Sequence, residues 1–256
     1  MTPKHPLTSL LLLWVLFSTH VYAEKLVIAA DDWFPMNGNP NSEFPGYMIE
    51  IAKEIFSSKG ITVKYELVPW ERALNQTRKG LYNCVVGAYK KDAPDFIFPK
   101  HPWGYDKPTF FVPINDPWQF DGNIASLQSR KLGVIEGYSY TKEFDAYSHN
   151  NRGLRVQVAT GDHALEINLR KLFAGRIDTI LENEYVLNAK LAAKDHPFPL
   201  KNAGYLSYAI PIYFACSPTL PSSQEYVQWA DQQLPKLRKT GRLKRILSRY
   251  QLSDWQ

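Results

Sequence analysis

The sequence predicts an α/β protein made of two doubly wound lobes that are joined by two hinge strands. Three observations support this fold class. Short apolar runs alternate with amphipathic segments along most of the chain, which is typical of parallel strands connected by helices. The same strand and helix plan occurs twice. A β-prone segment follows each copy, which suggests two similar lobes with two connections between them.

The first copy begins with the apolar run 26–30, which has the length and composition of a buried strand. A helix is expected over 47–56, where apolar residues recur on one helical face. Alternating apolar and polar residues in 63–67 predict a second strand. A helix over 70–79 and a third strand over 82–86 complete this copy.

The second copy follows the same order. Strands are expected over 131–135, 155–159 and 177–181. Ser139 or Thr141 is the expected N-cap of the helix that follows the first of these strands. A further helix before the last strand carries Leu165, Leu169, Leu172 and Phe173 on one face.

The two copies also share one local pattern. Residues 79–86 and 174–181 both combine a helix end, a glycine able to adopt positive φ, and a buried strand. The β-prone segments 109–113 and 208–213 then serve as crossings between the lobes, so the C-terminal helices return to the first lobe. The predicted division is a first lobe over 24–111 and 209–256, and a second lobe over 112–208.

Residues 1–23 have the features of a secretory signal peptide. Lys4 and His5 precede the apolar run 10–17, and Val21-Tyr22-Ala23 is a suitable small-residue cleavage site. A retained membrane anchor is the alternative, but the run is shorter than the ~20 residues that span a bilayer. We therefore expect a periplasmic protein that is cleaved near Ala23.

Composition narrows the partners and cofactors. The formal net charge is only +5, and the basic segment 236–249 has apolar residues at helical spacing, so it is interpreted as a solvated helix face. A nucleic-acid partner is not expected, and neither is a metal or other cofactor, because the histidines lack metal-ligand spacing. A monomer is expected. Cys84 and Cys216 allow one disulfide, but two buried thiols are equally compatible with the sequence.

Five motifs resemble those of a known family and occur in the family's order. They are an aromatic-Pro loop (32–36), a Gly-aromatic acidic helix (45–52), a Phe-Ile-Phe-Pro turn (96–99), the opening strand of the second lobe (131–137) and a Gly-Arg-x-Asp sequence (175–178). On these motifs nearly the whole mature chain resembles the family 3 solute-binding proteins of bacterial ABC transporters, the polar amino-acid type. The resemblance implies a type II periplasmic binding protein fold that closes over a small polar ligand.

Two positions depart from that family. Its carboxylate-binding Arg falls at Asp92 in this chain, and the nearby Lys90 lacks the planar two-donor fork of a guanidinium. Its ammonium-binding Asp falls at Asn183, which is flanked by Glu182 and Glu184. Both main anchors for a zwitterion are therefore altered, and the sequence does not assign an ordinary α-amino acid as the ligand.

Ligands of open α/β sheets bind beyond the carboxyl ends of the strands. Here those ends present the loops 31–34, 69–72, 89–91, 136–141, 160–162 and 182–184. The candidate ligand-binding residues in or near these loops are Asp32, Trp33, Phe34, Trp70, Arg72, Lys90, Tyr138, Ser139, Thr141, Glu182 and Asn183.

Each candidate also has a structural interpretation. The aromatic residues Trp33, Phe34 and Trp70 are either walls for stacking a ligand or parts of the core. Arg72 is either a cationic anchor or a solvent-facing helix residue. The 137–141 segment opens a helix that suits an anionic group, although its hydroxyls also suit helix caps. Glu182 or Glu184 is the expected partner of a ligand amine.

The sequence favours a binding protein over an enzyme. We expect it to capture a small polar ligand between its lobes and to present the closed state to an ABC permease or a sensor protein. The alternative is a cyclohexadienyl dehydratase-like enzyme on the same fold, with Glu182 or Glu184 as a general acid. No nucleophile elbow and no Gly-rich phosphate loop is present in the sequence.

Overall fold

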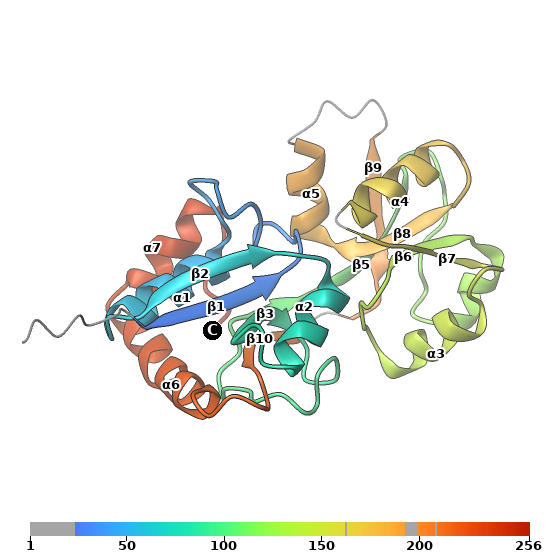
Figure 1. The fold of residues 1–256 in the computed structure, drawn as a ribbon. Coiled ribbons are helices and arrows are strands. Elements are labelled where there is room, and N and C mark those ends of the chain that lie inside the picture. Colours follow the sequence, from blue (N-terminus) through green and yellow to red (C-terminus); the bar gives the residue numbers. More distant parts are fainter. Residues whose placement is uncertain (1–23, 162, 193–198, 208) are drawn as a thin grey trace, which may run out of the picture.

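Two five-stranded sheets form two lobes that lie next to each other (Figure 1). The structure is a computed structural model that describes residues 24–161, 163–192, 199–207 and 209–256. The predicted leader, 1–23, lies outside the described residues. The predicted fold class of two α/β lobes is confirmed by the two sheets and the helices that cover them.

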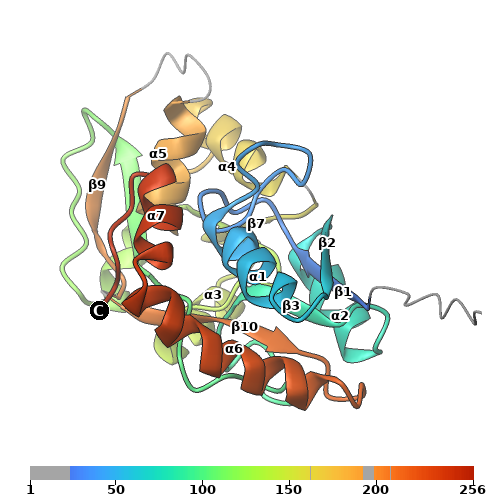
Figure 2. The ribbon, with the colours of Figure 1, turned by 90° about the vertical axis from the view of Figure 1, so that its left-hand side faces the viewer.

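The first lobe contains the sheet β2-β1-β3-β10-β4, in which β10 runs antiparallel to its neighbours and β1 runs parallel to β2 and β3. Helices α1, α6 and α7 pack on one face of this sheet, and α2 packs on the other (Figure 2). Its elements are β1 (Lys25–Ala30), α1 (Tyr47–Ser57), β2 (Thr62–Leu67), α2 (Trp70–Arg78), β3 (Cys84–Ala88), β4 (Gly104–Asp106), β10 (Ile210–Cys216), α6 (Ser223–Lys239) and α7 (Arg242–Arg249).

The second lobe contains the sheet β7-β6-β8-β5-β9, in which β5 runs antiparallel to β8 and β9. The sequence did not predict β9, because its six residues, Leu-Lys-Asn-Ala-Gly-Tyr, show neither an apolar run nor a clear alternation. The elements are β5 (Pro108–Pro113), a 3₁₀ helix (Ile124–Ser129), β6 (Leu132–Ile135), α3 (Lys142–Asn150), β7 (Val156–Ala159), α4 (Ala164–Phe173), β8 (Thr179–Asn183), α5 (Glu184–Ala192) and β9 (Leu200–Tyr205).

The chain crosses between the lobes twice. The first crossing is at Lys107, between β4 and β5, and the second lies between β9 and β10 at 206–209, of which residue 208 is outside the described part. All of β5 pairs within the second sheet. The predicted boundary at 111/112 would therefore divide one strand, because the β-prone pattern of 109–113 belongs to a sheet strand rather than to the crossing.

The repeated local pattern has the predicted geometry. Gly80 and Gly175 have φ values of +77° and +66°, which are left-handed conformations that favour glycine. Each glycine ends a helix and leads into a strand in the interior of its sheet, β3 in the first lobe and β8 in the second. The two lobes are therefore built on the same α/β unit.

Each lobe has its own apolar core. In the first lobe Trp103 stacks on Phe214, with ring centroids 4.9 Å apart, and Phe56 packs beside them. In the second lobe Phe110 and Phe144 lie at the centre of the main cluster. Tyr138 packs against clusters of both lobes, so it lies where they meet.

Cys84 and Cys216 form a disulfide between β3 and β10, which settles the alternative that the sequence left open. The two residues are direct partners in the antiparallel register of these strands. The bond therefore joins the part of the first lobe that precedes the second lobe to the part that follows it. Within the described residues, no helix is both long and apolar enough to cross a bilayer.

Candidate functional site

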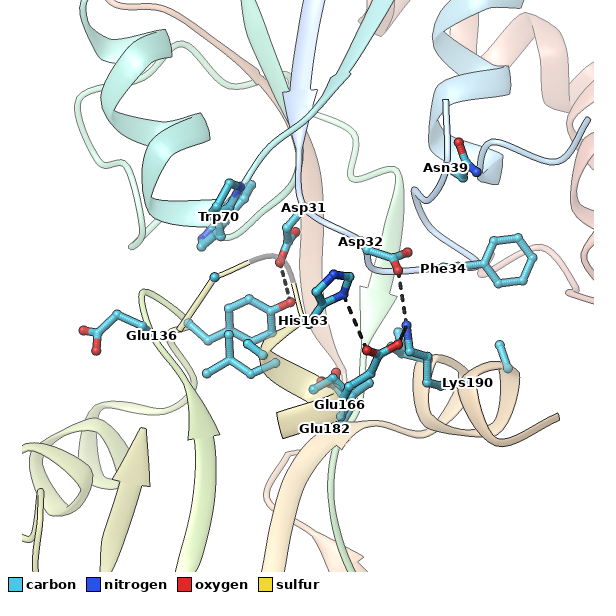
Figure 3. Close-up of a pocket in the computed structure, with 18 of the residues that line it drawn as sticks. Asp31, Asp32, Phe34, Asn39, Trp70, Glu136, His163, Glu166, Glu182 and Lys190 are labelled. Atoms are coloured by element: carbon cyan, nitrogen blue, oxygen red, sulfur yellow. Dashed lines mark hydrogen bonds and ion pairs between the residues drawn. The ribbon is translucent and has the colours of Figure 1, made fainter. Parts of the chain in front are cut away.

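A cavity of about 560 Å³ lies between the lobes, and we call it the outer cavity. The first lobe contributes the loops after β1 and β2, and the second contributes the loops after β6, β7 and β8 together with α4 and α5. Figure 3 shows Asp31, Asp32 and Trp70 facing Glu166, Glu182 and Lys190 across this space. The cavity has mixed walls, with Phe34, Trp70, Tyr138, Leu165 and Val186 among the apolar and aromatic residues that line it.

A second, smaller space of about 30 Å³, the inner cavity, continues behind the outer one. Asp31, Trp70, Tyr138 and Glu182 line both spaces and form their shared wall. A volume of this size holds one or two water-sized groups. The remaining residues of the inner cavity are Trp33, Val86, Gly87, Tyr89, Asp92, Asp106, Ser139, Tyr140 and Asn183.

Glu182 is the most enclosed carboxyl group of the shared wall. It lies near the end of β8 and is only 3% exposed. Its Oε1 accepts hydrogen bonds from Trp33 Nε1 at 3.1 Å and from the Asn183 amide at 2.8 Å, whereas its Oε2 has no partner. Burial raises the pKa of Glu182 to about 8, so the carboxyl is largely protonated at neutral pH. The Trp33 contact also joins the two lobes.

Asp31 follows β1 and makes a second connection between the lobes. Its Oδ2 accepts a hydrogen bond of 2.6 Å from the Tyr138 hydroxyl (Figure 3). Enclosure between the lobes raises the pKa of Asp31 to about 6, although the Tyr138 hydrogen bond opposes the shift. At neutral pH Asp31 is therefore mostly ionised and carries a negative charge into the wall.

Two further carboxyl groups complete the inner cavity. Burial raises the pKa of Asp92 to about 6, and its Oδ1 has no hydrogen-bond partner. Asp106 ends β4 and accepts hydrogen bonds from the Tyr89 hydroxyl and, at 2.5 Å, from Asn183 Nδ2. Burial also raises the pKa of Asp106. The inner cavity thus concentrates carboxyl groups in a small space.

The basic groups of the outer cavity are already paired. Lys190 lies 3.1 Å from Glu166 and 3.4 Å from Asp32. His163 Nδ1 lies 3.5 Å from Glu166, and Arg249 lies 2.9 Å from Glu50. Among the residues described around the inner cavity there is no Lys, Arg or His. A ligand anion therefore meets no unpaired cation among the described residues of either space.

The structure brings most of the predicted site residues together. Asp32 and Phe34 line the outer cavity, and Trp33, Ser139 and Asn183 line the inner one. Three more predicted residues, Trp70, Tyr138 and Glu182, lie in the shared wall. All six strand-end loops predicted to meet at one cleft contribute to these walls, although residue 162 lies outside the described part.

Three predicted residues line neither cavity. Arg72 is exposed, because two helical steps beyond Trp70 the α2 surface has turned to solvent. Lys90 is exposed as well and lies over the Tyr213 ring at 5.0 Å. Thr141 caps α3, and its hydroxyl accepts a hydrogen bond from the Phe144 amide. Of the two candidate acids at the end of β8, Glu182 rather than Glu184 faces the cleft.

Sequence reasoning missed Asp31, Asp92, Asp106 and Tyr140 as site residues. Asp31 had a usable signal, since it follows an apolar strand at the end where ligands bind. Asp106 had none, because it ends a strand of only three residues. Within the described residues no cluster of three or more His, Cys, Asp or Glu side chains is arranged to hold a metal ion.

Comparisons with solved structures agree with this architecture. A histidine kinase sensor domain with similarity to periplasmic binding proteins is 19% identical, with 88% of this chain and 95% of that chain covered and a TM-score of 0.73. A structure from work on glutathione import by GshT and the cystine ABC importer TcyBC of Streptococcus mutans is 16% identical, with 91% and 98% covered and a TM-score of 0.73.

An arginine transport system periplasmic binding protein from Legionella pneumophila is 16% identical, with 89% of this chain and 99% of that chain covered and a TM-score of 0.70. At these identities the likeness shows the fold alone, and it confirms the periplasmic binding protein fold implied by the sequence motifs. No protein-family model and no curated protein matches the chain.

Proposed function

We propose that this chain is a periplasmic solute-binding protein that acts as a monomer after its leader is removed. It captures a small polar ligand between its lobes and presents the closed state to a membrane partner, either an ABC permease or a sensor protein. The observation that carries this proposal is the outer cavity of about 560 Å³, which is lined by two lobes that the chain joins at two crossings. Rotation about two crossings can open and close such a space.

The contacts between the lobes support the proposal. Tyr138 with Asp31, Trp33 with Glu182 and Lys190 with Asp32 all join one lobe to the other, and all of these residues line one or both cavities. Closure therefore assembles the ligand site from two halves. Ligand binding and lobe closure are then one equilibrium, because the complete site exists only in the closed state.

A thermal-shift screen of the mature chain tests this function. The library contains amino acids, amines, organic acids, sugars and short peptides. A ligand at 100 times its dissociation constant stabilises the native state by about 2.7 kcal/mol, which gives a measurable rise in melting temperature. The variant Ala189→Trp fills the outer cavity and should abolish the shift. Ala192→Trp, on the exposed end of the same helix, should keep it. A complete absence of shifts would contradict the proposal.

The enzyme alternative has one observation in its favour, the raised pKa of Glu182, which keeps a proton available in the cleft at neutral pH. Against it, the dianionic substrate of a cyclohexadienyl dehydratase would have to lie in the outer cavity, where each described basic side chain already lies beside a carboxylate. We expect no turnover of prephenate above the uncatalysed rate. Turnover that is lost in Glu182→Gln would instead establish the enzyme.

A further inference from the structure

We propose that the inner cavity binds the ammonium group of an amine whose body occupies the outer cavity, and that no ligand carboxylate is required. This inference rests on the proposed function, since it names the ligand class of the same cleft. Primary alkyl and arylalkyl amines and diamines belong to this class. Three features of the inner cavity support it: its unpaired polar atoms, its charge and its size.

Three polar atoms of the inner cavity are buried without a hydrogen-bond partner. They are Asp92 Oδ1, Glu182 Oε2 and the Tyr140 hydroxyl oxygen. Glu182 is 3% exposed and Tyr140 is 7% exposed, so bulk water does not satisfy these side chains. Buried polar atoms normally have partners, and several unpaired ones around one space indicate a missing group. A primary ammonium has three N–H donors and no acceptor. A cation beside Glu182 favours the ionised form of this carboxyl group, and all three oxygens can then act as acceptors.

The charge around the inner cavity selects a cation. Asp31, Asp92, Asp106 and Glu182 line it, and its described lining contains no basic side chain. A carboxylate or phosphate placed there would lie beside these carboxyl groups and would meet no basic side chain among the described lining residues. A neutral hydroxyl would provide only one donor for three acceptors. An ammonium gains hydrogen bonds to charged groups, which are stronger than neutral ones.

The size of the two spaces divides the ligand. The inner cavity of about 30 Å³ holds an ammonium group but no hydrocarbon chain beyond it. The rest of the molecule must pass between Trp70 and Tyr138, which line both spaces, into the outer cavity. There Phe34 and Leu165 offer apolar surface, and the described basic side chains, Lys190, His163 and Arg249, each lie beside a carboxylate. Nothing in this arrangement calls for an anionic group at the far end.

Isothermal titration calorimetry of the mature chain tests the inference with matched probes. The amines are n-butylamine, 1,4-diaminobutane and 2-phenylethylamine. Butyrate, 2-phenylethanol and phenylalanine are the counterparts that replace the ammonium group or add a carboxylate. We expect at least one amine to bind. Butyrate and 2-phenylethanol, which lack the ammonium group, should bind at least about tenfold more weakly, the cost of a lost hydrogen bond to a charged group. Phenylalanine should also bind more weakly than 2-phenylethylamine, because its carboxylate meets no unpaired cation among the described residues of either cavity.

Variants locate the ammonium. Asp92→Asn and Glu182→Gln keep the shape of the cavity but cannot carry a negative charge beside an ammonium group, so each should weaken amine binding about tenfold or more. Glu71→Gln changes an exposed carboxylate of the outer cavity and should alter it less than about twofold. Circular dichroism verifies folding. If one inner variant is unfolded, Tyr140→Phe removes a single acceptor and should still weaken binding.

Three results would overturn the inference. Amine binding that persists in every folded inner variant would show that the ammonium lies elsewhere. Thermal shifts that occur only with anionic or neutral solutes, and that Ala189→Trp abolishes, would support the solute-binding function but contradict an amine as the ligand. Water would then occupy the inner cavity. No shift with any solute would remove both proposals together.

Discussion

The outer and inner cavities share a wall but differ in how their charges are paired. In the outer cavity the described cations are neutralised by carboxylates, as Lys190 is by Asp32 and Glu166. In the inner cavity carboxyl groups lie together without a described cation, and oxygens of Asp92 and Glu182 have no partner. The outer space is large and mixed in character, whereas the inner one is small and acidic.

This difference separates two tasks within one cleft. In the outer cavity each described basic side chain lies beside a carboxylate, so ligands there are distinguished by shape and by apolar contact. Unpaired buried carboxyl groups raise the free energy of the empty protein, and a cation that enters lowers it again. Under the proposed function, the inner cavity selects ligands by charge and the outer cavity selects them by size, so changes in the two spaces should have different effects.

The largest expected effect is on stability at alkaline pH. Burial raises the pKa of Glu182 from an ordinary 4.5 to about 8, so the folded protein holds this proton more tightly than the unfolded chain. The ionised form is disfavoured by folding, and stability decreases as pH rises from about 4.5 to about 8. Glu182→Gln removes this loss and should stabilise the empty protein by about 2–4 kcal/mol at pH 8.5.

Urea unfolding of Glu182→Gln and the parent at pH 5 and pH 8.5 measures this effect. The two proteins should differ little at pH 5 and clearly at pH 8.5. Glu71→Gln, the exposed counterpart in the outer cavity, should stay within about 0.5 kcal/mol of the parent at both values. If both variants changed the free energy of unfolding equally at both pH values, the proposed difference between the inner and outer carboxyl groups would be wrong.

The next effect concerns the shared wall. Tyr138→Phe removes the hydroxyl that donates to Asp31 and leaves an enclosed carboxylate without that partner. The free energy of unfolding should fall by about 1–3 kcal/mol at pH 7. The loss should shrink below pH 6, where Asp31 becomes protonated. Small-angle scattering should also show a more open average shape, because this contact joins the lobes. A loss that is independent of pH would exclude the ionised Asp31 as its cause.

A smaller effect should distinguish the two spaces by ligand shape. Phe34 lines only the outer cavity and is half-buried, with its ring 5.7 Å from that of Tyr250. Phe34→Ala should weaken the binding of 2-phenylethylamine by about 1 kcal/mol, since an aromatic contact is lost. Binding of n-butylamine should hardly change. Titration of both amines against both proteins measures the difference, and equal losses would place the two ligands in the same space.

The smallest effect is expected at a paired cation. Lys190 lies beside both Asp32 and Glu166, and such partly exposed ion pairs contribute little. Lys190→Met should change the free energy of unfolding by less than about 1 kcal/mol. Amine binding should stay the same or strengthen slightly, because two outer carboxylates lose their partner. Strong weakening would instead show that Lys190 contacts the ligand.

The sequence predicted the fold well because apolar periodicity and helix-ending glycines are local signals. The helix predicted over 47–56 is α1, and the strand predicted over 26–30 is β1 with one additional residue. The strand that ends at Asp106 was missed because three residues carry no periodicity. The crossing at Lys107 was placed inside β5, since a β-prone run looks the same in a sheet and between lobes.

The site was predictable only in part. Strand-end position found Glu182, Trp70 and Tyr138, which all line the shared wall. Arg72 failed because sequence does not fix the rotation of a helix about its axis. The resemblance placed the family's Arg position at Asp92, and the structure shows a carboxylate there in the cavity. Sequence alone could show that Arg was absent, but not that the carboxyl group of Asp92 lines the cavity.

The disulfide has a topological consequence. Cys84 precedes the second lobe in the chain, and Cys216 follows it 132 positions later. The disulfide therefore closes a covalent ring that contains the whole second lobe. A single proteolytic cut in that lobe opens the ring without dividing the molecule. The cut protein should run at its full mass on a non-reducing gel and as two fragments after reduction. The first lobe is thus covalently continuous although its sequence is interrupted, and in the gene the second lobe is an insertion within the first.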